Sequence, residues 1–309
     1  MKYSKLDRSQ LEIAKITFGS WELGGGQWEK ESDEINIQAI QRAYDLGIHT
    51  FDTAEGYGNG HSETIVGLAL EGKRKECVIA TKVAPNHLKA ADVRVSAENS
   101  LKRLRTDYID LLYIHWPNNE VPLEETLAEF NKLKEEKLIR AIGLSNFSLG
   151  LLQQAVQLAD IDAIQPEYSL LHRGIEAEIL PYCIENKIAV MTYSSIAKGI
   201  LTGVYHFGNA VIKDNDFRRE RRLFLPDHLE KETELVQLVK EIAEARGVTM
   251  SEVAIAWLLQ QKGVTSAIVG TQKLKHLEEN IRAVDLLLTG DEINRLSEVS
   301  TRVIASIDN

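Results

Sequence analysis

Four side chains that can bind or transfer protons occur at, or just beyond, the ends of three apolar runs. The run IHTFD ends at Asp52 and leads into a glycine-rich loop that carries Tyr57. The run CVIATK ends at Lys82, and the run IDLLYIH ends at His115. Taken singly, these residues fit ordinary structural roles, such as a helix cap, a loop aromatic, an edge lysine and a core histidine. Together they favour an active site, because a β/α barrel builds its chemistry where its strands end.

The four residue types suggest proton transfer to a substrate. A tyrosine has an ordinary pKa near 10. An ammonium about 4 Å away is worth roughly 4 kcal/mol at an effective dielectric of about 20, or about three pKa units. We therefore expect Lys82 to lower the pKa of Tyr57 so that the phenol becomes an efficient general acid. Asp52 is the natural partner of a buried lysine, and His115 could hydrogen-bond a substrate oxygen. Because no electron source accompanies this donor, we expect a nicotinamide cofactor to supply a hydride.

Short apolar runs alternate with amphipathic segments along nearly the whole chain. The runs are rich in Val, Ile, Thr and Tyr and continuously hydrophobic, which is typical of parallel strands covered on both faces. Eight β-then-α units predict an α/β fold, a single-domain (β/α)8 TIM barrel over residues 1–309. A doubly wound sheet is the alternative. The expected strands are residues 13–21, 49–54, 77–83, 109–115, 139–145, 163–169, 189–195 and 266–271.

Helix signals lie between the expected strands. Ser32 precedes an amphipathic stretch that ends at Gly47, and Pro122 suits the first turn of the next segment, LEETLAEFNKLKEEK. The stretches SLGLLQQAVQLA, GIEAEILPYCIEN and SEVAIAWLLQQKG, and the tail from Asp291, also read as helices. Residues 204–232 interrupt this alternation of strand and helix patterns, because they show no clear periodicity. A connection of this length after the seventh strand is either a functional loop or a solvated excursion.

Composition narrows the class of protein. The net charge of −10 argues against nucleic acid as a partner, since phosphates require a basic face. We expect a cytoplasmic protein, because no apolar run approaches the ~18 to 20 residues of a membrane span and no leader-like segment starts the chain. The two cysteines, Cys77 and Cys183, are expected to be reduced thiols in the core. The histidines lack ligand spacing, so no metal is expected. No GxGxxG follows a strand, so the usual dinucleotide fingerprint is absent.

Over essentially its full length the chain resembles the aldo-keto reductases. The matching motifs occur in the family's order and spacing, and the likeness is closest to the bacterial and plant branch that includes the potassium-channel β subunits. The motifs are DTAEGYGNGHSE, ATK, YIHWP, IRAIGLSNFS, IQPEYSLLHR, YSSIAKGILTG and IVGTQKLKHLEEN. The resemblance implies an NADP(H)-dependent reduction of aldehydes or ketones, with Tyr57 as the general acid and Asp52, Lys82 and His115 completing a tetrad.

The resemblance also implies binding residues. Ser145, Asn146 and Gln165 would hold the nicotinamide carboxamide, and Tyr193 would stack on its ring. The segment from Ser194 to Leu201 would carry the pyrophosphate, and Asp216 and Arg218 match an Asp-x-Arg of the long loop that can fold over the cofactor. Gly270 and Thr271, with His276 and Asn280, would meet the adenosine end. Trp21, Trp28 and Trp116 would border the substrate pocket. The full set of cofactor-binding residues is expected to be Gly19, Ser20, Trp21, Ser145, Asn146, Gln165, Tyr193, Ser194, Ser195, Ile196, Gly199, Leu201, Arg218, Gly270, Thr271, Gln272, Lys273, His276, Glu279 and Asn280.

Three positions depart from the family pattern. Gln272 and His276 stand where Lys or Arg is frequent, and Val204 stands where many members have Lys. Lys273 and Lys275 could still hold a 2′-phosphate, so NADP(H) is expected, with NAD(H) not excluded.

Two other functions stay open, as do the carbonyl substrate and the oligomeric state. One is a cofactor-binding regulatory subunit, as the channel-associated relatives suggest. The other is a glycoside hydrolase that uses two carboxylates, for which Asp52, Glu55 and Glu167 are the candidates.

Overall fold

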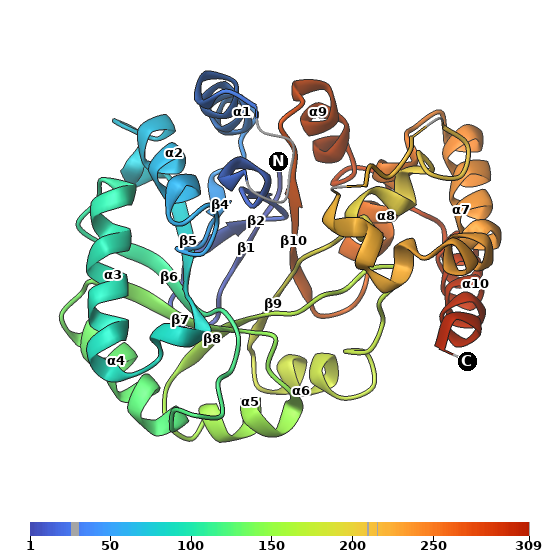
Figure 1. Ribbon diagram of the computed structural model, residues 1–309. Coiled ribbons are helices and arrows are strands. Elements are labelled where there is room, and N and C mark those ends of the chain that lie inside the picture. Colours follow the sequence, from blue (N-terminus) through green and yellow to red (C-terminus); the bar gives the residue numbers. More distant parts are fainter. Residues whose placement is uncertain (26–30, 209, 215, 309) are drawn as a thin grey trace.

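The computed structural model describes residues 1–25, 31–208, 210–214 and 216–308 and has the architecture of a closed barrel (Figure 1). Its strands are all parallel to their neighbours, in the order β10-β3-β4-β5-β6-β7-β8-β9, and β9 pairs with β10 to close the ring. The expected (β/α)8 barrel is therefore confirmed. The strand bounds are β3 Ile16–Gly19, β4 Thr50–Asp52, β5 Val78–Val83, β6 Ile109–Ile114, β7 Ile139–Ser145, β8 Ile161–Gln165, β9 Ala189–Thr192 and β10 Val264–Gly270.

Helices surround the strands (Figure 1). α1 begins after Ser32, whose hydroxyl accepts a hydrogen bond from the backbone N–H of Ile35, and the chain leaves it through Gly47 at a φ of 86°. Pro122 lies just before α4 rather than within its first turn. The helix bounds are α1 Asp33–Asp45, α2 His61–Ala69, α3 Ala90–Leu104, α4 Leu123–Glu135, α5 Leu149–Ala155, α6 Ile179–Glu185, α7 Pro226–Arg246, α8 Met250–Leu259, α9 Leu274–Arg282 and α10 Gly290–Asp308.

Two layers of apolar side chains stabilise the barrel. The larger one lies between the strands and the helices and includes Phe18, Phe51, Phe130 and Trp257. The smaller one fills the interior with side chains such as Leu111, Tyr113 and Met191 from the strands, and with Leu6, Leu11 and Ile13 from the N-terminal segment. That segment forms an antiparallel hairpin of β1 (Tyr3–Lys5) and β2 (Glu12–Ala14). Because it immediately precedes β3, it covers the end of the barrel at which the strands begin.

Several expected boundaries were wrong. Residues 13–21 do not form one strand: Ile13 and Ala14 belong to the hairpin, a bend at Lys15 follows, and only Ile16–Gly19 enter the barrel. The strand expected over 163–169 ends at Gln165 because Pro166, which has no N–H, follows it. The seventh strand stops at Thr192, and α6 does not begin until Ile179.

The connection after β9 is shorter and more ordered than expected. Its described residues form the short 3-10 helices η4 (Ala197–Thr202), η5 (Phe217–Glu220) and η6 (Arg222–Phe224). Residues 226–232, assigned to this loop from the sequence, are the first turns of α7, with Pro226 at its start. None of the helices in the described part of the chain is long and apolar enough to cross a membrane.

Candidate active site

The barrel brings Asp52 and Lys82 into direct contact. Asp52 ends β4, Lys82 lies near the end of the neighbouring β5, and both side chains are buried. Lys82 Nζ lies 2.5 Å from Asp52 Oδ1 and also donates to the carbonyl oxygen of Thr53 at 2.8 Å. Burial alone would lower the pKa of Lys82, but Asp52 and the Tyr57 hydroxyl raise it above the ordinary value. The lysine is thus a fixed cation at the end of the barrel.

Tyr57 is within reach of this cation. Its hydroxyl oxygen lies 3.2 Å from Lys82 Nζ, and the ammonium also lies 4.8 Å from the centre of its ring. The expected net lowering of the Tyr57 pKa is wrong for this structure. Burial raises the pKa of Tyr57, Lys82 acts in the opposite direction, and Asp52 adds a further increase. The phenol is therefore firmly protonated, a donor held against an ammonium.

His115, directly after β6, faces Tyr57. The two rings meet edge to face with their centres 5.6 Å apart. Burial, and then the charge of Lys82, lowers the pKa of His115 to about 3. The imidazole is therefore neutral at physiological pH, and it can hydrogen-bond an uncharged oxygen without adding a second cation to the site.

The polar residues expected at the ends of β7 and β8 form one network. Ser145 donates to the backbone carbonyl of Gln165, and Asn146 donates to that of His115. Tyr193 donates to Asn146 Oδ1 at 2.7 Å. Gln165 donates to Asp52 Oδ2 at 2.7 Å. The network therefore joins these four residues to the lysine–aspartate pair.

The segment from Ser194 to Leu201 has an unusual backbone. Ser194, Ala197 and Lys198 have positive φ angles of 55°, 49° and 53°, and Gly199 has 103°. Non-glycine residues in this region cost on the order of 1 kcal/mol or more each and are often found at binding sites. Left-handed turns of this kind direct backbone N–H groups into concavities that bind anions. Ser195 anchors the segment by donating to the carbonyl of Ile268 on β10.

The two other carboxylates that could serve a glycosidase are already paired. Glu167 accepts from Lys198 at 2.8 Å, which holds its pKa below the usual value despite burial. Glu55 accepts from the backbone N–H of Ala84 and contacts His87 at 3.0 Å. Both carboxylates therefore have a structural use, and the lowered pKa of Glu167 does not suit a general acid.

The loop after β9 reaches the mouth of the site. Asp216 and Arg218 pair within this loop, where Asp216 also accepts from the backbone N–H of Arg218. Phe217 packs edge to face on Trp21, with ring centres 5.4 Å apart, and Trp21 lies 6.4 Å from the ring of Tyr57. Sequence reasoning missed Phe217, because only the flanking Asp-x-Arg carried a signal.

The last group of expected residues surrounds the end of β10. Gly270 pairs in register with Gly19 on β3, and a Cβ at Gly270 would lie 2.9 Å from the carbonyl oxygen of Gly19. Only glycine fits there because the two backbones approach so closely. Thr271 and Asn280 are buried, whereas Lys273, Lys275 and His276 are exposed.

Other members of this group are held by neighbours. The Gln272 amide donates to Asn36 Oδ1 and to the backbone carbonyl of Glu22. Glu279 lies 3.7 Å from Lys275 within α9. Ser20, at the end of β3, donates to the carbonyl of Asp52. Among the expected substrate residues, Trp116 is 47% exposed beside His115, and Trp28 falls outside the described residues.

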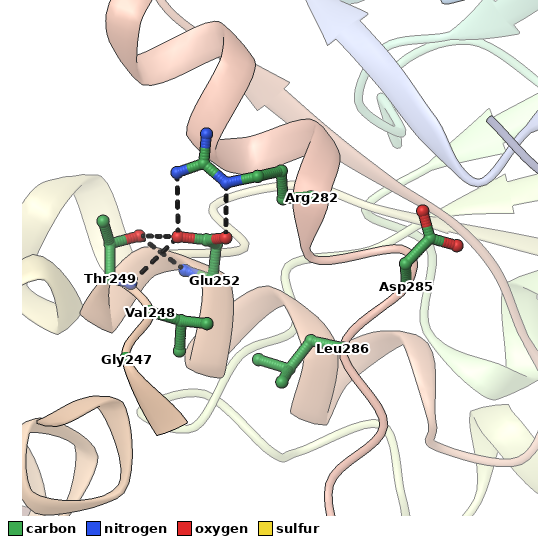
Figure 2. Close-up of a pocket in the computed structure, with 7 residues that line it drawn as sticks. All are labelled: Gly247, Val248, Thr249, Glu252, Arg282, Asp285 and Leu286. Atoms are coloured by element: carbon green, nitrogen blue, oxygen red, sulfur yellow. Dashed lines mark hydrogen bonds and ion pairs between the residues drawn. The ribbon is translucent and has the colours of Figure 1, made fainter. Parts of the chain in front are cut away.

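A separate hollow lies between α8 and the segment after α9 (Figure 2). One of its two carboxylates, Glu252, accepts from Thr249 in a capping box and from Arg282 at 2.9 Å. Glu252 and Arg282 are therefore committed to holding two helices together. None of the tetrad residues lines this hollow, so we assign it no catalytic part.

The sequence matches the "Aldo/keto reductase family" over residues 15–301. It is 36% identical to "Aldo-keto reductase YhdN" of Bacillus subtilis, over 90% of this chain and 87% of that protein. It is 32% identical to "NADH-specific methylglyoxal reductase" of Escherichia coli, over 97% and 98%. It is 34% identical to "Probable voltage-gated potassium channel subunit beta" of Arabidopsis thaliana, over 97% and 96%.

Among solved structures, the chain resembles an aldo/keto reductase from Klebsiella pneumoniae in complex with NADP and acetate. The identity is 30%, the TM-score is 0.77, and the likeness covers 94% of this chain and 93% of that one. The family and its branch, expected from the motifs, are thereby confirmed: this chain is a member of the aldo/keto reductase family, oxidoreductases that act on carbonyl groups and use nicotinamide cofactors.

Proposed function

We propose that this protein reduces aldehydes or ketones to alcohols with NADP(H), and that Tyr57 donates the proton. The observation that carries this proposal is the contact chain Asp52–Lys82–Tyr57, with the neutral ring of His115 against the phenol. When bound, the nicotinamide supplies a hydride to the carbonyl carbon. Tyr57 protonates the carbonyl oxygen as negative charge develops there, and His115 orients that oxygen by a hydrogen bond.

Lys82 serves the proton transfer through its charge. As the phenol gives up its proton, the phenolate oxygen is left 3.2 Å from the ammonium. The ammonium therefore stabilises the product state more than the starting state, which favours transfer. Asp52 and the carbonyl of Thr53 keep Lys82 in place and charged.

The donor groups present fit a nicotinamide dinucleotide. Ser145, Asn146 and Gln165 offer hydroxyl and amide groups suited to a carboxamide, and Tyr193 offers a ring beside them. The left-handed backbone from Ser194 to Gly199 suits the pyrophosphate, as does Arg218 of the loop after β9. Thr271, Lys273, His276, Glu279 and Asn280 would hold the adenosine end.

The preference for NADP(H) is supported by Lys273 and Lys275 beside this adenosine end and by the NADP complex of the Klebsiella relative. The Escherichia coli relative named as NADH-specific argues for a narrow preference.

The test is a screen of NADPH and NADH oxidation by the purified protein across aldehydes, ketones and sugars. At least one carbonyl compound should be reduced, faster with NADPH than with NADH. Tight NADPH binding without oxidation by any compound would contradict a reductase and favour a regulatory subunit. Hydrolysis of aryl glycosides without added cofactor would also contradict the proposal.

A further inference from the structure

Glu22 is an acidic residue in the proposed cofactor site, where the negatively charged phosphates of NADP(H) would favour positive side chains. It opens η1 (Glu22–Gly24), immediately after β3, and its side chain points toward the end of β10. A Cβ built on Gly270 would lie 3.8 Å from the carboxyl carbon of Glu22. The backbone carbonyl of Glu22 accepts a hydrogen bond from Gln272. The carboxylate is therefore held against the residues proposed to meet the adenosine end.

Two cations act on this carboxylate. Burial raises the pKa of Glu22 to about 7, and the charges of Arg218 on η5 and Lys273 before α9 oppose that rise. Within the described residues the Glu22 carboxylate has no hydrogen bond or ion pair of its own. The charges of both cations therefore act on the Glu22 carboxylate, although it forms a direct ion pair with neither of them within the described residues.

The charged side chains of α2 that lie near η1 in the described part of the chain have other partners. Helix α2 packs against η1, and its His61 contacts Asp33 at 3.0 Å. Glu63, also on α2, accepts from Arg103 and Thr81. Among the described residues of η1 and α2, Glu22 is therefore the acidic group whose charge acts on Lys273, and it adds to the charge of Asp216 at Arg218.

We propose that Glu22 is a specificity-determining residue that weakens the preference for NADP(H) over NAD(H). This inference rests on the proposed function, because it takes the end of β10 as the adenosine site. A carboxylate accepts a hydrogen bond from a ribose 2′-hydroxyl but repels a 2′-phosphate. Lys273 attracts that phosphate, and Glu22 offsets this attraction.

Lys275 does not compensate for the repulsion between Glu22 and a 2′-phosphate. It is 85% exposed and pairs with Glu279 at 3.7 Å. Screening by solvent reduces the contribution of such an exposed charge. Lys273 and Glu22 are therefore the pair that decides how strongly the site favours the phosphorylated cofactor.

The experiment compares NADPH and NADH dissociation constants, measured by fluorescence titration without substrate, for the wild type and for Glu22→Gln. The amide keeps the size of the side chain and removes its charge. We expect NADPH affinity to rise about tenfold, and NADH affinity to stay within about twofold or to fall. Glu135→Gln, at an exposed position of α4, removes the same charge far from the site and should change neither constant.

The same titrations below and above pH 7 give a second readout. Above the Glu22 pKa of about 7 the wild-type carboxylate is charged, so the NADPH-to-NADH affinity ratio of the wild type should fall relative to that of Glu22→Gln as pH rises. The 2′-phosphate has its own pKa near 6, but it titrates equally in both proteins. The difference between wild type and Glu22→Gln should therefore grow with pH.

The outcomes separate this inference from the proposed function. Equal changes in both affinities, or no change, would overturn the role of Glu22 and leave the reductase proposal standing. If neither protein bound either dinucleotide, the proposed function would fail, and the role of Glu22 with it. Circular dichroism and the midpoint of thermal unfolding establish that Glu22→Gln is folded in either case.

Discussion

Gln165 donates a 2.7 Å hydrogen bond to Asp52. The residue proposed to hold the nicotinamide carboxamide is therefore also hydrogen-bonded to the carboxylate of the Asp52–Lys82 ion pair. Asp52 accepts from Lys82 through its other oxygen, and Lys82 reaches the Tyr57 hydroxyl. The proposed cofactor site and the proposed proton donor are thus joined by three consecutive hydrogen bonds across the end of the barrel.

A first prediction tests this link. Gln165→Leu removes a hydrogen bond to a buried carboxylate, which should cost about 1.5–3 kcal/mol in the free energy of unfolding. Cofactor affinity should fall as well, because the amide is proposed to bind the carboxamide. Urea unfolding and NADPH titration measure the two effects. Gln153→Leu, at an exposed position of α5, is the control and should alter neither. Weaker cofactor binding at unchanged stability would show that the Asp52 contact contributes little.

The proton donor gives a second prediction. Tyr57→Phe removes the hydroxyl but keeps the ring that packs near Trp21 and His115. Turnover should fall by about 10²- to 10⁴-fold, the usual contribution of general acid catalysis. The dissociation constant for NADPH should change little, because the hydroxyl points to Lys82. Tyr3→Phe, in the N-terminal hairpin, should retain full activity. Substantial turnover by Tyr57→Phe would remove Tyr57 from its proposed role.

Much of this arrangement could be predicted from the sequence, and for physical reasons. The barrel strands are continuous apolar runs, so a polar residue at the end of a strand is easy to recognise in the sequence. Because the strands are parallel, their C-terminal ends lie at the same end of the barrel. Asp52, Lys82, Tyr57 and His115 could therefore be grouped before their contacts were known.

Other features depend on packing that no local pattern records. Burial determines the direction of the Tyr57 pKa, against the effect of Lys82. The pairing of Lys198 with Glu167 depends on a backbone that turns left-handed. Glu22 carries no motif, and only the approach of β3 to β10 brings it to Lys273.

The buried ion pair gives a third prediction. Lys82→Met leaves Asp52 charged and buried without its cation, which should lower the free energy of unfolding by about 3–5 kcal/mol. Adding Asp52→Asn should recover part of that loss, because the buried charge is then gone. Equilibrium urea unfolding of the single and double variants measures this recovery. Lys132→Met breaks an exposed contact with Glu129 and should cost no more than about 1 kcal/mol. A double variant no more stable than Lys82→Met would argue against the unpaired charge as the cause.

A fourth prediction concerns Glu232, which is fully buried on α7. Neither of its carboxyl oxygens has a partner within the described residues, and the same holds for Nδ1 of His206 and of His228. Burial raises the pKa of Glu232 to about 8. In the unfolded chain the carboxyl would titrate near 4.3. Between these values the folded protein holds a proton that the unfolded chain has released, so stability should fall as pH rises from about 4 to about 8.

Glu232→Gln removes this titration while keeping a neutral polar group of the same size. The variant and the wild type should therefore be similarly stable near pH 3, where both side chains are essentially uncharged in both states. Near pH 8 the variant should be more stable, by on the order of 3 kcal/mol. Urea unfolding across this range measures the difference, and Glu230→Gln, exposed on the same helix, is the control. A difference that does not grow with pH would mean that the folded protein accommodates the charged Glu232 carboxylate.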